Sequence, residues 1–359
     1  MSTKTPVEMK FELSCPTPLP VRDTILLGHG SGGKLSAELI RDIFLPAFDN
    51  PVLARLDDQA IVNVNGQRLA MTTDSFVVKP LFFPGGDIGS LAVHGTVNDL
   101  AMGGAMPLFL SVAFIIEEGF STDQLRRVVN SLRRAAADAG VHIVTGDTKV
   151  VEKGKGDGLF LNTTGIGLVP EGVELSADRA RPGDKVLLSG SIGDHGIAIL
   201  AQREGLEFET QIESDSAALH TLVADMLRAT SRQSSDLRCM RDPTRGGVSS
   251  TLNEIAERSR VGIELQESSL PIHEQVRGAC ELLGLDPLYV ANEGKLIAIV
   301  APEAAGAVLQ AMKAHPLGAE ARIIGTVKTE NPGLVTMRTP LGTTRVVDML
   351  TGDQLPRIC

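Results

Sequence analysis

Two stretches of mixed pattern, separated by a looser one, constrain the fold of this chain most. In the first stretch, the apolar run Leu108–Ile116 (LFLSVAFII) predicts a buried strand, and Ser121 begins a predicted helix with Gln124 at the spacing of a capping box. The second stretch repeats this mixture, without a short-period repeat. Between them, Glu171–Asp184 has weak periodicity and contains Pro182-Gly183, which favours a domain boundary. The sequence therefore predicts an α+β protein of two domains, and its length of 359 residues agrees.

Local signals place several elements in the first half. Asp23–Gly28 is predicted to be a short strand that enters a glycine loop, and the helix that follows the loop is expected to stop at Pro46. Asn65-Gly66, between two runs typical of strands, predicts a tight hairpin. A further helix is expected to have Asp87 as its N-cap and to end at Gly103-Gly104. The first half is thus expected to hold both strands and helices.

The bulk composition argues against two classes of partner. A net charge of −10 lacks the basic footprint of a protein that binds nucleic acid, and an aromatic content of 3%, with no Trp, offers few platforms for stacked bases. No segment reaches the ~20 apolar residues of a membrane span, and the N-terminal stretch lacks the apolar core of a signal peptide. We therefore expect no nucleic acid and no membrane partner, and a cytoplasmic location.

The four cysteines are scattered and form no CxxC pair, which fits a reducing compartment and gives no zinc pattern. Cys239 and Cys280 are expected to pack as small apolar residues. Cys359, the last residue, has two interpretations. An exposed thiol without a role is the plainer one. However, the nine residues TGDQLPRIC, at ~3.3 Å each, reach about 30 Å when extended, so the thiol can also carry a chemical group between sites.

The stretch GHGSGGKLS has the glycine and lysine spacing of a P-loop. That motif next needs Ser or Thr to bind Mg²⁺, but here Leu35 follows Lys34. A standard P-loop NTPase is therefore not expected. From the residues alone, the loop remains either a tight turn or an anion site formed by backbone amides.

Aspartates recur beside small residues at the predicted ends of strands and helices. Each one alone is typical of a cap or a turn. Together, carboxylates of this kind would suit Mg²⁺ that bridges the phosphates of a nucleotide. The six are Asp57, Asp58, Asp74, Asp99, Asp147 and Asp242.

A series of motifs in a fixed order resembles one known family. The motifs are GHGSGG, DDQA, TTDSF, PLFFPGGDIG, GTVNDLAMGGA, IIEEG, TGDTKVV, RDPTRGGV, ANEGK and the final PRIC. The sequence from Leu27 to Cys359 resembles the HypE family of carbamoyl dehydratases of [NiFe]-hydrogenase maturation, within the PurM-like (aminoimidazole ribonucleotide synthetase) superfamily. The shorter motifs DD, TTD and ND also occur in other members of that superfamily, whereas PRIC, TGDTKVV and ANEGK are more specific.

The resemblance implies a two-domain PurM-like architecture with a flexible C-terminal tail. Residues 1–22 would be a disordered leader. Members of the family usually start close to the first of these motifs, so the leader departs from their pattern. Residues 23–172 would form the ATP-binding and dimerisation domain, residues 173–345 a C-terminal α+β domain, and residues 346–359 a mobile tail. A homodimer formed through the sheet edges of the N-terminal domain is the corresponding expectation.

The resemblance also implies a magnesium–nucleotide site. The glycine loop would be a mobile cover over the phosphates of ATP. The expected nucleotide-binding residues are Gly30, Ser31, Gly32, Gly33, Asp74, Asp147 and Arg245. The expected Mg²⁺ ligands are Asp58, Asp99 and Asp242, with Asp57 as a competitor of Asp58. For Arg245, an ion pair within the protein is the alternative to a phosphate contact.

The chemistry implied by the resemblance centres on Cys359. A HypF-type carbamoyltransferase would place a carbamoyl group on its sulfur, and ATP-dependent dehydration would convert the thiocarbamate into a thiocyanate. A HypC–HypD type scaffold would then receive the cyano group as the ligand of iron. Glu293 and Lys149 map onto the pair that would remove protons from nitrogen. A structural ion pair for Glu293 and a phosphate contact for Lys149 remain alternatives.

Two other functions stay open at this point. Another PurM-like synthetase or kinase would use the same aspartates without needing the thiol of Cys359. A nucleotide-binding scaffold would bind ATP without forming product. His94 is expected to be a structural residue, and His195 is given no catalytic role.

Overall fold

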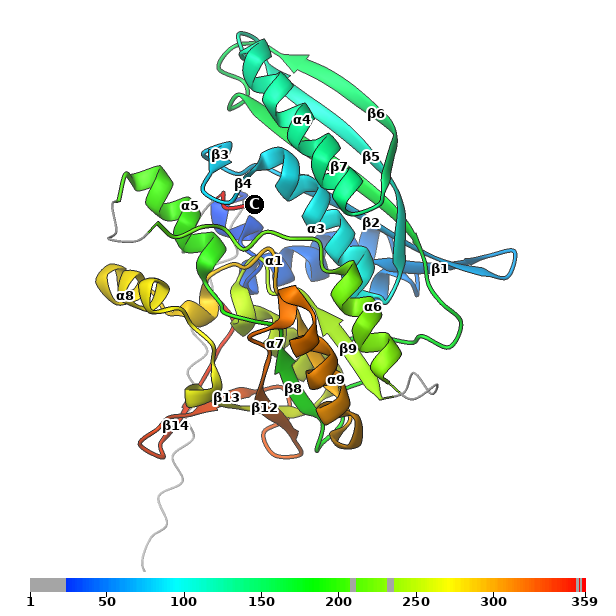
Figure 1. Ribbon diagram of the computed structural model, residues 1–359, viewed down its shortest axis with the longest axis vertical. Coiled ribbons are helices and arrows are strands. Elements are labelled where there is room, and N and C mark those ends of the chain that lie inside the picture. Colours follow the sequence, from blue (N-terminus) through cyan, green and yellow to red (C-terminus); the bar gives the residue numbers. More distant parts are fainter. Residues whose placement is uncertain (1–23, 207–210, 231–235, 353–354, 356) are drawn as a thin grey trace, which may run out of the picture.

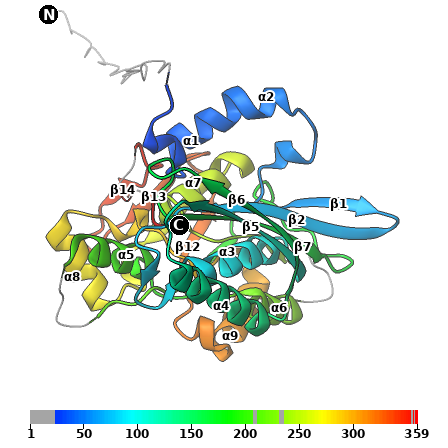
Figure 2. The same ribbon diagram turned by 90° about the horizontal axis from the view of Figure 1, so that it is seen from above.

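The computed structural model describes residues 24–359, except 207–210, 231–235, 353–354 and 356, so the expected leader lies outside it. Among the described residues, five strands form a mixed sheet in the order β1-β2-β7-β5-β6, in which only β5 and β6 are parallel. The strands are β1 (Ala60–Val64), β2 (Gln67–Phe76), β5 (Met106–Glu117), β6 (His142–Val151) and β7 (Leu159–Leu168). Helices α3 (Ile88–Met102) and α4 (Thr122–Asp138) cover one face of this sheet (Figures 1 and 2).

A second sheet follows in the C-terminal half, in the order β14-β13-β10-β12-β8-β11-β9. Its strands are β8 (Lys185–Leu188), β9 (Leu237–Arg241), β10 (Gly262–Gln266), β11 (Ile297–Val300), β12 (Arg322–Lys328), β13 (Val335–Arg338) and β14 (Thr344–Val346). The helices of this half are α5 (Asp194–Glu204), α6 (His220–Ala229), α7 (Gly247–Ser259), α8 (Glu274–Leu283) and α9 (Pro302–Ala314). The described structure is thus α+β, as expected, and β14 reaches one residue into the segment assigned to the tail.

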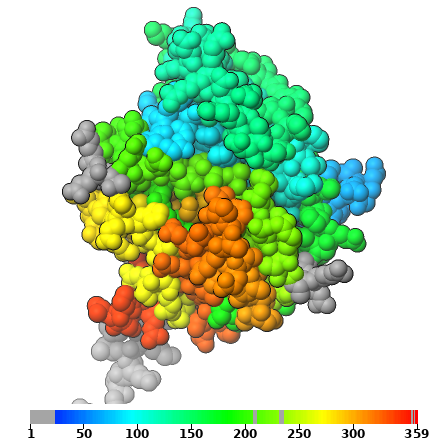
Figure 3. Space-filling model, viewed as in Figure 1, coloured from blue at the N-terminus to red at the C-terminus, as the bar shows by residue number. Residues whose placement is uncertain are grey.

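Successive side chains of β8 and of β11 belong alternately to two hydrophobic clusters. Val186 and Ile297 pack with the buried face of α7, whereas Leu187 and Ala298 belong to a cluster with α9 and α6. That second cluster also contains Leu100 of α3. The core is therefore continuous from the first sheet to the second. Figure 3 shows the outer surface that covers it, in the orientation of Figure 1.

The predicted strand Asp23–Gly28 is wrong for the described residues. Leu27–Gly30 forms a 3₁₀ turn (η1), in which the amide of His29 donates to the carbonyl of Leu26 at 3.0 Å. The apolar run has no neighbouring strand with which to pair, so a local turn satisfies its backbone instead. The predicted helix does begin after the loop, as α1 (Lys34–Leu39), a π-helical turn η2 (Ile40–Phe44) and α2 (Leu45–Ala47).

Several local predictions are confirmed. Asn65 and Gly66 both have positive φ, as a tight hairpin between β1 and β2 requires. Asp87 caps α3 by accepting hydrogen bonds from the amides of Gly89 and Ser90. The remaining short elements are η3 (Leu53–Arg55), β3 (Phe82–Phe83), β4 (Gly86–Asp87), η4 (Glu267–Ser269), η5 (Pro287–Tyr289) and η6 (Pro316–Gly318).

The end of the chain returns to the middle of the molecule. Figure 1 places the C-terminus near β3, β4 and α5, away from β14. The amide of Val77, just beyond β2, donates to a backbone oxygen of Cys359 at 3.0 Å, and Ile358 is buried. The last described residues therefore bridge elements from both halves of the sequence.

Candidate active site

Carboxylates from three separate elements lie close enough to perturb one another's charge. Asp58 precedes β1, Asp99 lies in the last turn of α3, and Asp242 follows β9. Burial raises the pKa of Asp58 and Asp99 well above the ordinary value and the pKa of Asp242 to about 6, and the charge of Asp242 raises the pKa of both others further. Thr72 donates to Oδ2 of Asp99 at 2.7 Å and to the carbonyl of Asp58 at 3.0 Å, so it links two members of the set.

Asp57 and Asp58 have different surroundings. Oδ1 of Asp57 accepts hydrogen bonds from Ser176 and from the amide of Ala177, and its Oδ2 pairs with Arg55 at 3.1 Å. Oδ2 of Asp58, in contrast, is buried and has no hydrogen-bond partner among the described residues. Asp57 is thus occupied by structural contacts, whereas Asp58 retains a free ligand atom.

These carboxylates fit a magnesium ion, although they do not complete a site alone. In the part of the chain that the structure describes, no three His, Cys, Asp or Glu side chains are arranged to hold a metal ion by themselves. Mg²⁺ ordinarily keeps several water ligands and is bound through one or two carboxylates together with substrate phosphates. The unpartnered oxygen of Asp58 is available as a ligand. A bound cation would also relieve the mutual repulsion of the acids.

Glu293 lies beside this set, in the loop before β11. Its carboxyl is buried, and Oε1 has no hydrogen-bond partner among the described residues. Burial, followed by the charges of Asp242 and Asp74, raises the pKa of Glu293 well above the ordinary value. The backbone of Glu293 is held by Asp215, whose Oδ1 accepts from its amide at 3.0 Å. Glu293 therefore has a fixed backbone and a carboxyl that can accept or hold a proton.

The sulfur of Cys359 lies in the same region. Burial raises the pKa of its thiol to about 12, the nearby guanidinium of Arg245 opposes that shift, and the charges of Glu293 and Asp74 add to it. The charge of Cys359 is in turn the main cause that raises the pKa of Arg245. The structure thus brings together Cys359, Arg245, Glu293 and Asp74, four of the residues named from the sequence.

The glycine loop reaches this group through Arg245. Nη1 of Arg245 donates to the carbonyl of Gly30 at 2.8 Å. Gly32 has φ +74°, and a Cβ there would lie 2.6 Å from the carbonyl oxygen of Arg245, so only glycine fits. Ser31 is buried and donates to the carbonyl of Gly28 at 2.8 Å.

Lys34, which has the spacing of a P-loop lysine, makes contacts within the protein. The amide of Lys34 donates to the carbonyl of Leu350 at 2.9 Å, and its ammonium group pairs with Asp348 at 2.6 Å. Gly33 also packs against Leu350, because a Cβ at Gly33 would lie 2.2 Å from the Leu350 oxygen. The loop is thus joined to the segment that leads to the tail, and the first amide of its helix is bonded within the protein.

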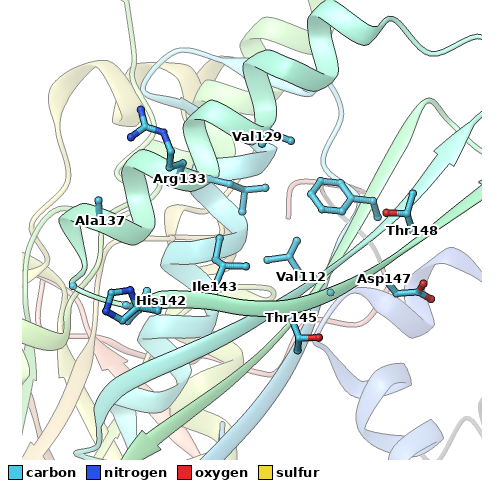
Figure 4. Close-up of a pocket in the computed structure, with 14 residues that line it drawn as sticks. Val112, Val129, Arg133, Ala137, His142, Ile143, Thr145, Asp147 and Thr148 are labelled. Atoms are coloured by element: carbon cyan, nitrogen blue, oxygen red, sulfur yellow. The ribbon is translucent and has the colours of Figure 1, made fainter.

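A single chain does not bring Lys149 and Asp147 to the other site residues. They form an ion pair at 3.1 Å on β6, with side chains 70% and 61% exposed. A cavity of about 1140 Å³ lies between α4, β5 and β6, apart from the acidic cluster. Figure 4 shows Ile143 and Val112 directed toward α4, while Thr145 and Asp147 point away from it. Lys149 pairs with Ile115 in the parallel register and lies on the open face of the sheet, opposite the helices.

Sequence reasoning missed three residues of this region. Arg241, directly before Asp242, pairs with Asp58 at 2.8 Å and with Glu254 at 2.8 Å. Asp215 holds the Glu293 loop, and His195 contacts the tail through the carbonyl of Ile358 at 2.7 Å. Arg241 could have been suspected from its place in RDPTRGG, but nothing local marks Asp215 or His195.

Comparisons with known proteins identify the family of the chain. Models of the AIR synthase related protein family match both halves, the N-terminal domain at residues 56–169 and the C-terminal domain at residues 181–336. The carbamoyl dehydratase HypE of Bradyrhizobium diazoefficiens is 60% identical over 333 residues, which cover 93% of this chain and 95% of that protein. The chain belongs to the HypE family of carbamoyl dehydratases.

Solved structures of HypE proteins share the fold. A HypE–HypF complex matches with a TM-score of 0.82 and 50% identity, over 87% of this chain and 99% of the solved one. HypE in complex with ATP matches with a TM-score of 0.78 and 52% identity, over 94% of this chain and 100% of the solved one. None of the helices in the described part has the length and apolarity needed to cross a membrane.

Proposed function

We propose that this HypE-family protein is an ATP-dependent S-carbamoyl-cysteine dehydratase. It converts a thiocarbamate on Cys359 into a thiocyanate, the source of the cyanide ligand of [NiFe]-hydrogenase iron. The observation that carries the proposal is the position of the Cys359 sulfur, which lies beside Arg245 and the buried, unpartnered carboxyl of Glu293. An enzyme that acted on a free small molecule would not require a cysteine in this place.

The reaction follows from the chemistry of the amide. Oxide is a poor leaving group, so S–C(=O)–NH₂ does not lose water readily. Transfer of the γ-phosphoryl group of ATP to the amide oxygen makes phosphate the leaving group. Nitrogen then loses its two protons, the C–O bond breaks, and S–C≡N, ADP and phosphate are formed. The oxygen of the carbamoyl group leaves in the phosphate, so atoms balance without free water.

The residues of the chain supply position and proton transfer. In its ionised form, Glu293 is a suitable acceptor for a nitrogen proton, because burial raises its pKa and so makes the carboxylate a stronger base, and because its Oε1 has no competing partner among the described residues. Arg245 lies beside the sulfur and offers a planar pair of donors to the phosphoryl group on the adjacent oxygen. Asp74 lies close enough to raise the pKa of both Cys359 and Glu293.

Asp58, Asp99 and Asp242 would hold Mg²⁺. When bound, the ion would neutralise these carboxylates and link them to phosphate oxygens of the nucleotide. The pKa of each acid is raised by burial and by its acidic neighbours, which is the condition that a bound cation would relieve. Asp57 is left out of the set, because both of its oxygens have structural partners.

We further propose a homodimer that covers the open face of the N-terminal sheet, in place of the contact through sheet edges that the resemblance implied. Met71, Ile166 and Phe109 lie side by side in register on this face and are exposed. Contiguous exposed apolar side chains of this kind mark an interface. Asp147 and Lys149 lie on the same face, so a second copy would receive them. The site would then combine Lys149 and Asp147 of one protomer with Glu293 and Cys359 of the other.

One proposed partner acts before the dehydration and the other acts after it. A HypF-type carbamoyltransferase would load Cys359, as the solved complex of a relative with HypF supports. A HypC–HypD type scaffold would accept the cyano group for iron, in the cytoplasm. Residues 23–172 would then serve ATP binding and dimerisation, 173–345 would form the second domain, and 346–359 would move the thiol between partners.

Mass spectrometry of the C-terminal peptide tests the reaction. The full chain is incubated with a HypF-type partner, a carbamoyl donor and ATP. We expect the peptide to gain a carbamoyl group on Cys359 and then to lose one water, while a non-hydrolysable ATP analogue should stop the sequence at the first gain. Two results would contradict the proposal. One is a peptide that never changes mass, and the other is a Cys359→Ala variant that still forms product from a free substrate.

A further inference from the structure

The last three residues are bound mainly through their backbone. The amide of Lys79 donates to the carbonyl of Arg357 at 3.1 Å, and the amide of Val77 donates to a backbone oxygen of Cys359, in its terminal carboxylate, at 3.0 Å. The carbonyl between them, that of Ile358, faces His195 at 2.7 Å. Each of three consecutive residues thus has a donor to its backbone oxygen, which is the pattern of a peptide added beside an existing backbone edge.

His195 has one orientation that satisfies all its contacts. It is fully buried, and burial lowers its pKa, so the ring is neutral and carries one hydrogen. The carbonyl of Ile358 can only accept, so this hydrogen is assigned to Nε2, and Nδ1 accepts from the hydroxyl of Ser214 at 2.7 Å. The ring of Phe83 packs edge-on against the imidazole, with centroids 5.7 Å apart. The donor to the tail is therefore also held by Ser214 and Phe83, which do not belong to the tail.

A second charged donor comes from α5. Nη2 of Arg203 donates to the carbonyl of Arg357 at 2.7 Å, while its Nε donates to the carbonyl of Lys79 at 2.9 Å. Arg203 thus joins the bound segment to the edge on which it lies. Hydrogen bonds from a charged donor are stronger than those between neutral groups. This contact therefore strengthens binding of the segment, and it does not depend on which side chains the segment carries.

Two side chains of the segment make specific contacts with the rest of the protein. The guanidinium of Arg357 pairs with Asp157, and its Nε donates to the carbonyl of Val77 at 3.1 Å. Ile358 is buried in a cluster that contains Ile197 and Val290. A basic residue followed by an aliphatic one therefore sets the register that leaves the next side chain, Cys359, beside Arg245.

We propose that Val77, Lys79, Asp157, His195 and Arg203 form a binding site for a short peptide that ends in Arg, an aliphatic residue and Cys. His195 and Arg203 are positioning residues, since they hold the backbone and do not touch the reacting atoms. The site takes such a peptide from solution as well as from its own chain. The inference rests on the proposed function only in treating Cys359 as the carrier.

Competition with the chain's own tail tests this site. Iodoacetamide alkylates the docked Cys359 slowly, because the residue is partly buried and the pKa of its thiol is raised to about 12. The probe is a synthetic peptide of the last five residues with Ser in place of Cys, at millimolar concentration, because an attached tail has a millimolar effective concentration. We expect the alkylation rate of Cys359 in the intact protein to rise at least about fivefold.

A matched peptide with Glu in place of Arg serves as the control. It cannot pair with Asp157, so it should leave the alkylation rate of Cys359 unchanged. The proposal is overturned if the first peptide has no effect or if both peptides act equally. Peptide mapping follows Cys359 separately from the other cysteines.

Variants of the positioning residues give a second readout. His195→Phe and Arg203→Ala should each raise the alkylation of Cys359 without added peptide, while His195→Gln, which keeps a donor, should restore part of the protection. A rise shared with the buried Cys280 would indicate general loosening and would overturn the positioning role. These measurements use neither ATP nor a carbamoyl donor. Their failure would leave the proposed reaction standing, and failure of the reaction would leave the peptide site standing.

Discussion

The backbone amide of Glu293 donates to Oδ1 of Asp215 at 3.0 Å, and the other oxygen of Asp215 pairs with Lys295 at 3.0 Å. The side chains of this ion pair are only 5% and 13% exposed. Gly294 lies directly against this segment, because a Cβ there would be 1.7 Å from the carbonyl oxygen of Asp215. One buried carboxylate thus fixes the loop that carries the proposed base.

Asp215→Ala should destabilise the fold strongly. Removal of one partner of a buried ion pair costs about 3–5 kcal/mol, since the other charge is left buried and unpaired. Asp215→Asn keeps an acceptor for the amide of Glu293 and loses only the charge, so its loss of stability should be smaller. Urea unfolding of the three proteins measures the difference. Equal midpoints for wild type and Asp215→Ala would show that the pair is not important.

Gly33→Ala should destabilise the contact between the glycine loop and the segment before the tail. A Cβ at Gly33 would lie 2.2 Å from the carbonyl oxygen of Leu350, whereas a Cβ at Gly30 would meet nothing within 4 Å. We expect a loss of roughly 1–3 kcal/mol for Gly33→Ala and a change within about 0.5 kcal/mol for Gly30→Ala. Thermal or urea unfolding compares the two variants, and equal effects would contradict the packing argument.

Asp58→Asn and Asp57→Asn should show which of the two adjacent aspartates binds Mg²⁺. If Asp58 holds Mg²⁺, its amide variant should lower magnesium affinity on the order of 10–100-fold. Asp57→Asn changes a residue whose oxygens contact Arg55, Ser176 and Ala177, so it should affect stability more than magnesium affinity. Titration of ATP-dependent product formation with magnesium provides the measurement. The reverse order of effects would assign the ligand to Asp57.

Mixing two inactive variants tests the proposed shared site. Glu293→Gln and Lys149→Ala are each expected to be inactive as homodimers. In a mixed dimer, one site has both substitutions and the other has neither, so random exchange of protomers should restore about a quarter of wild-type activity. If Glu293 and Lys149 acted within one protomer, no mixture would recover activity. The control is a mixture of Glu293→Gln with Cys359→Ala, which under the same proposal fall in one protomer's site and should stay inactive.

The stability of the protein should fall in mild acid partly because of His94. Burial lowers the pKa of His94 to about 4, below the ordinary value of about 6.5. The unfolded chain therefore binds a proton here before the folded chain does, and the free energy of unfolding decreases as pH falls from about 6.5 to 4. The slope from this residue is at most about 1.4 kcal/mol per pH unit. Urea unfolding of His94→Gln should show a flatter dependence in this window, and an unchanged slope would contradict the prediction.

Local chemistry explains which features could be predicted from the sequence. The Asn65-Gly66 hairpin and the Asp87 cap depend on residues within four positions of each other, so their signals are local. The strand expected at Asp23–Gly28 failed because a strand also needs a partner, which no local pattern reveals. His195 was passed over for a similar reason, since its contact with Ile358 joins residues far apart in the sequence.

The site residues show the same limit. Motifs indicated Asp58, Asp99, Asp242 and Glu293. The structure places the three aspartates within electrostatic reach of one another, and Glu293 within reach of Asp242. The pairing of Lys149 with Glu293 came from resemblance, and a single chain keeps Lys149 on the exposed face of β6. Sequence spacing cannot indicate whether a residue serves its own chain or a neighbouring copy.

The bond between Lys34 and Leu350 has a kinetic consequence. The glycine loop cannot lift without breaking this bond and separating Gly33 from the same carbonyl. If the loop covers the phosphates of ATP, as the resemblance implies, entry of the nucleotide would displace the segment that leads to the sulfur of Cys359. Nucleotide and carbamoyl group should consequently add in a compulsory order, which initial-rate patterns with both concentrations varied would distinguish from random addition.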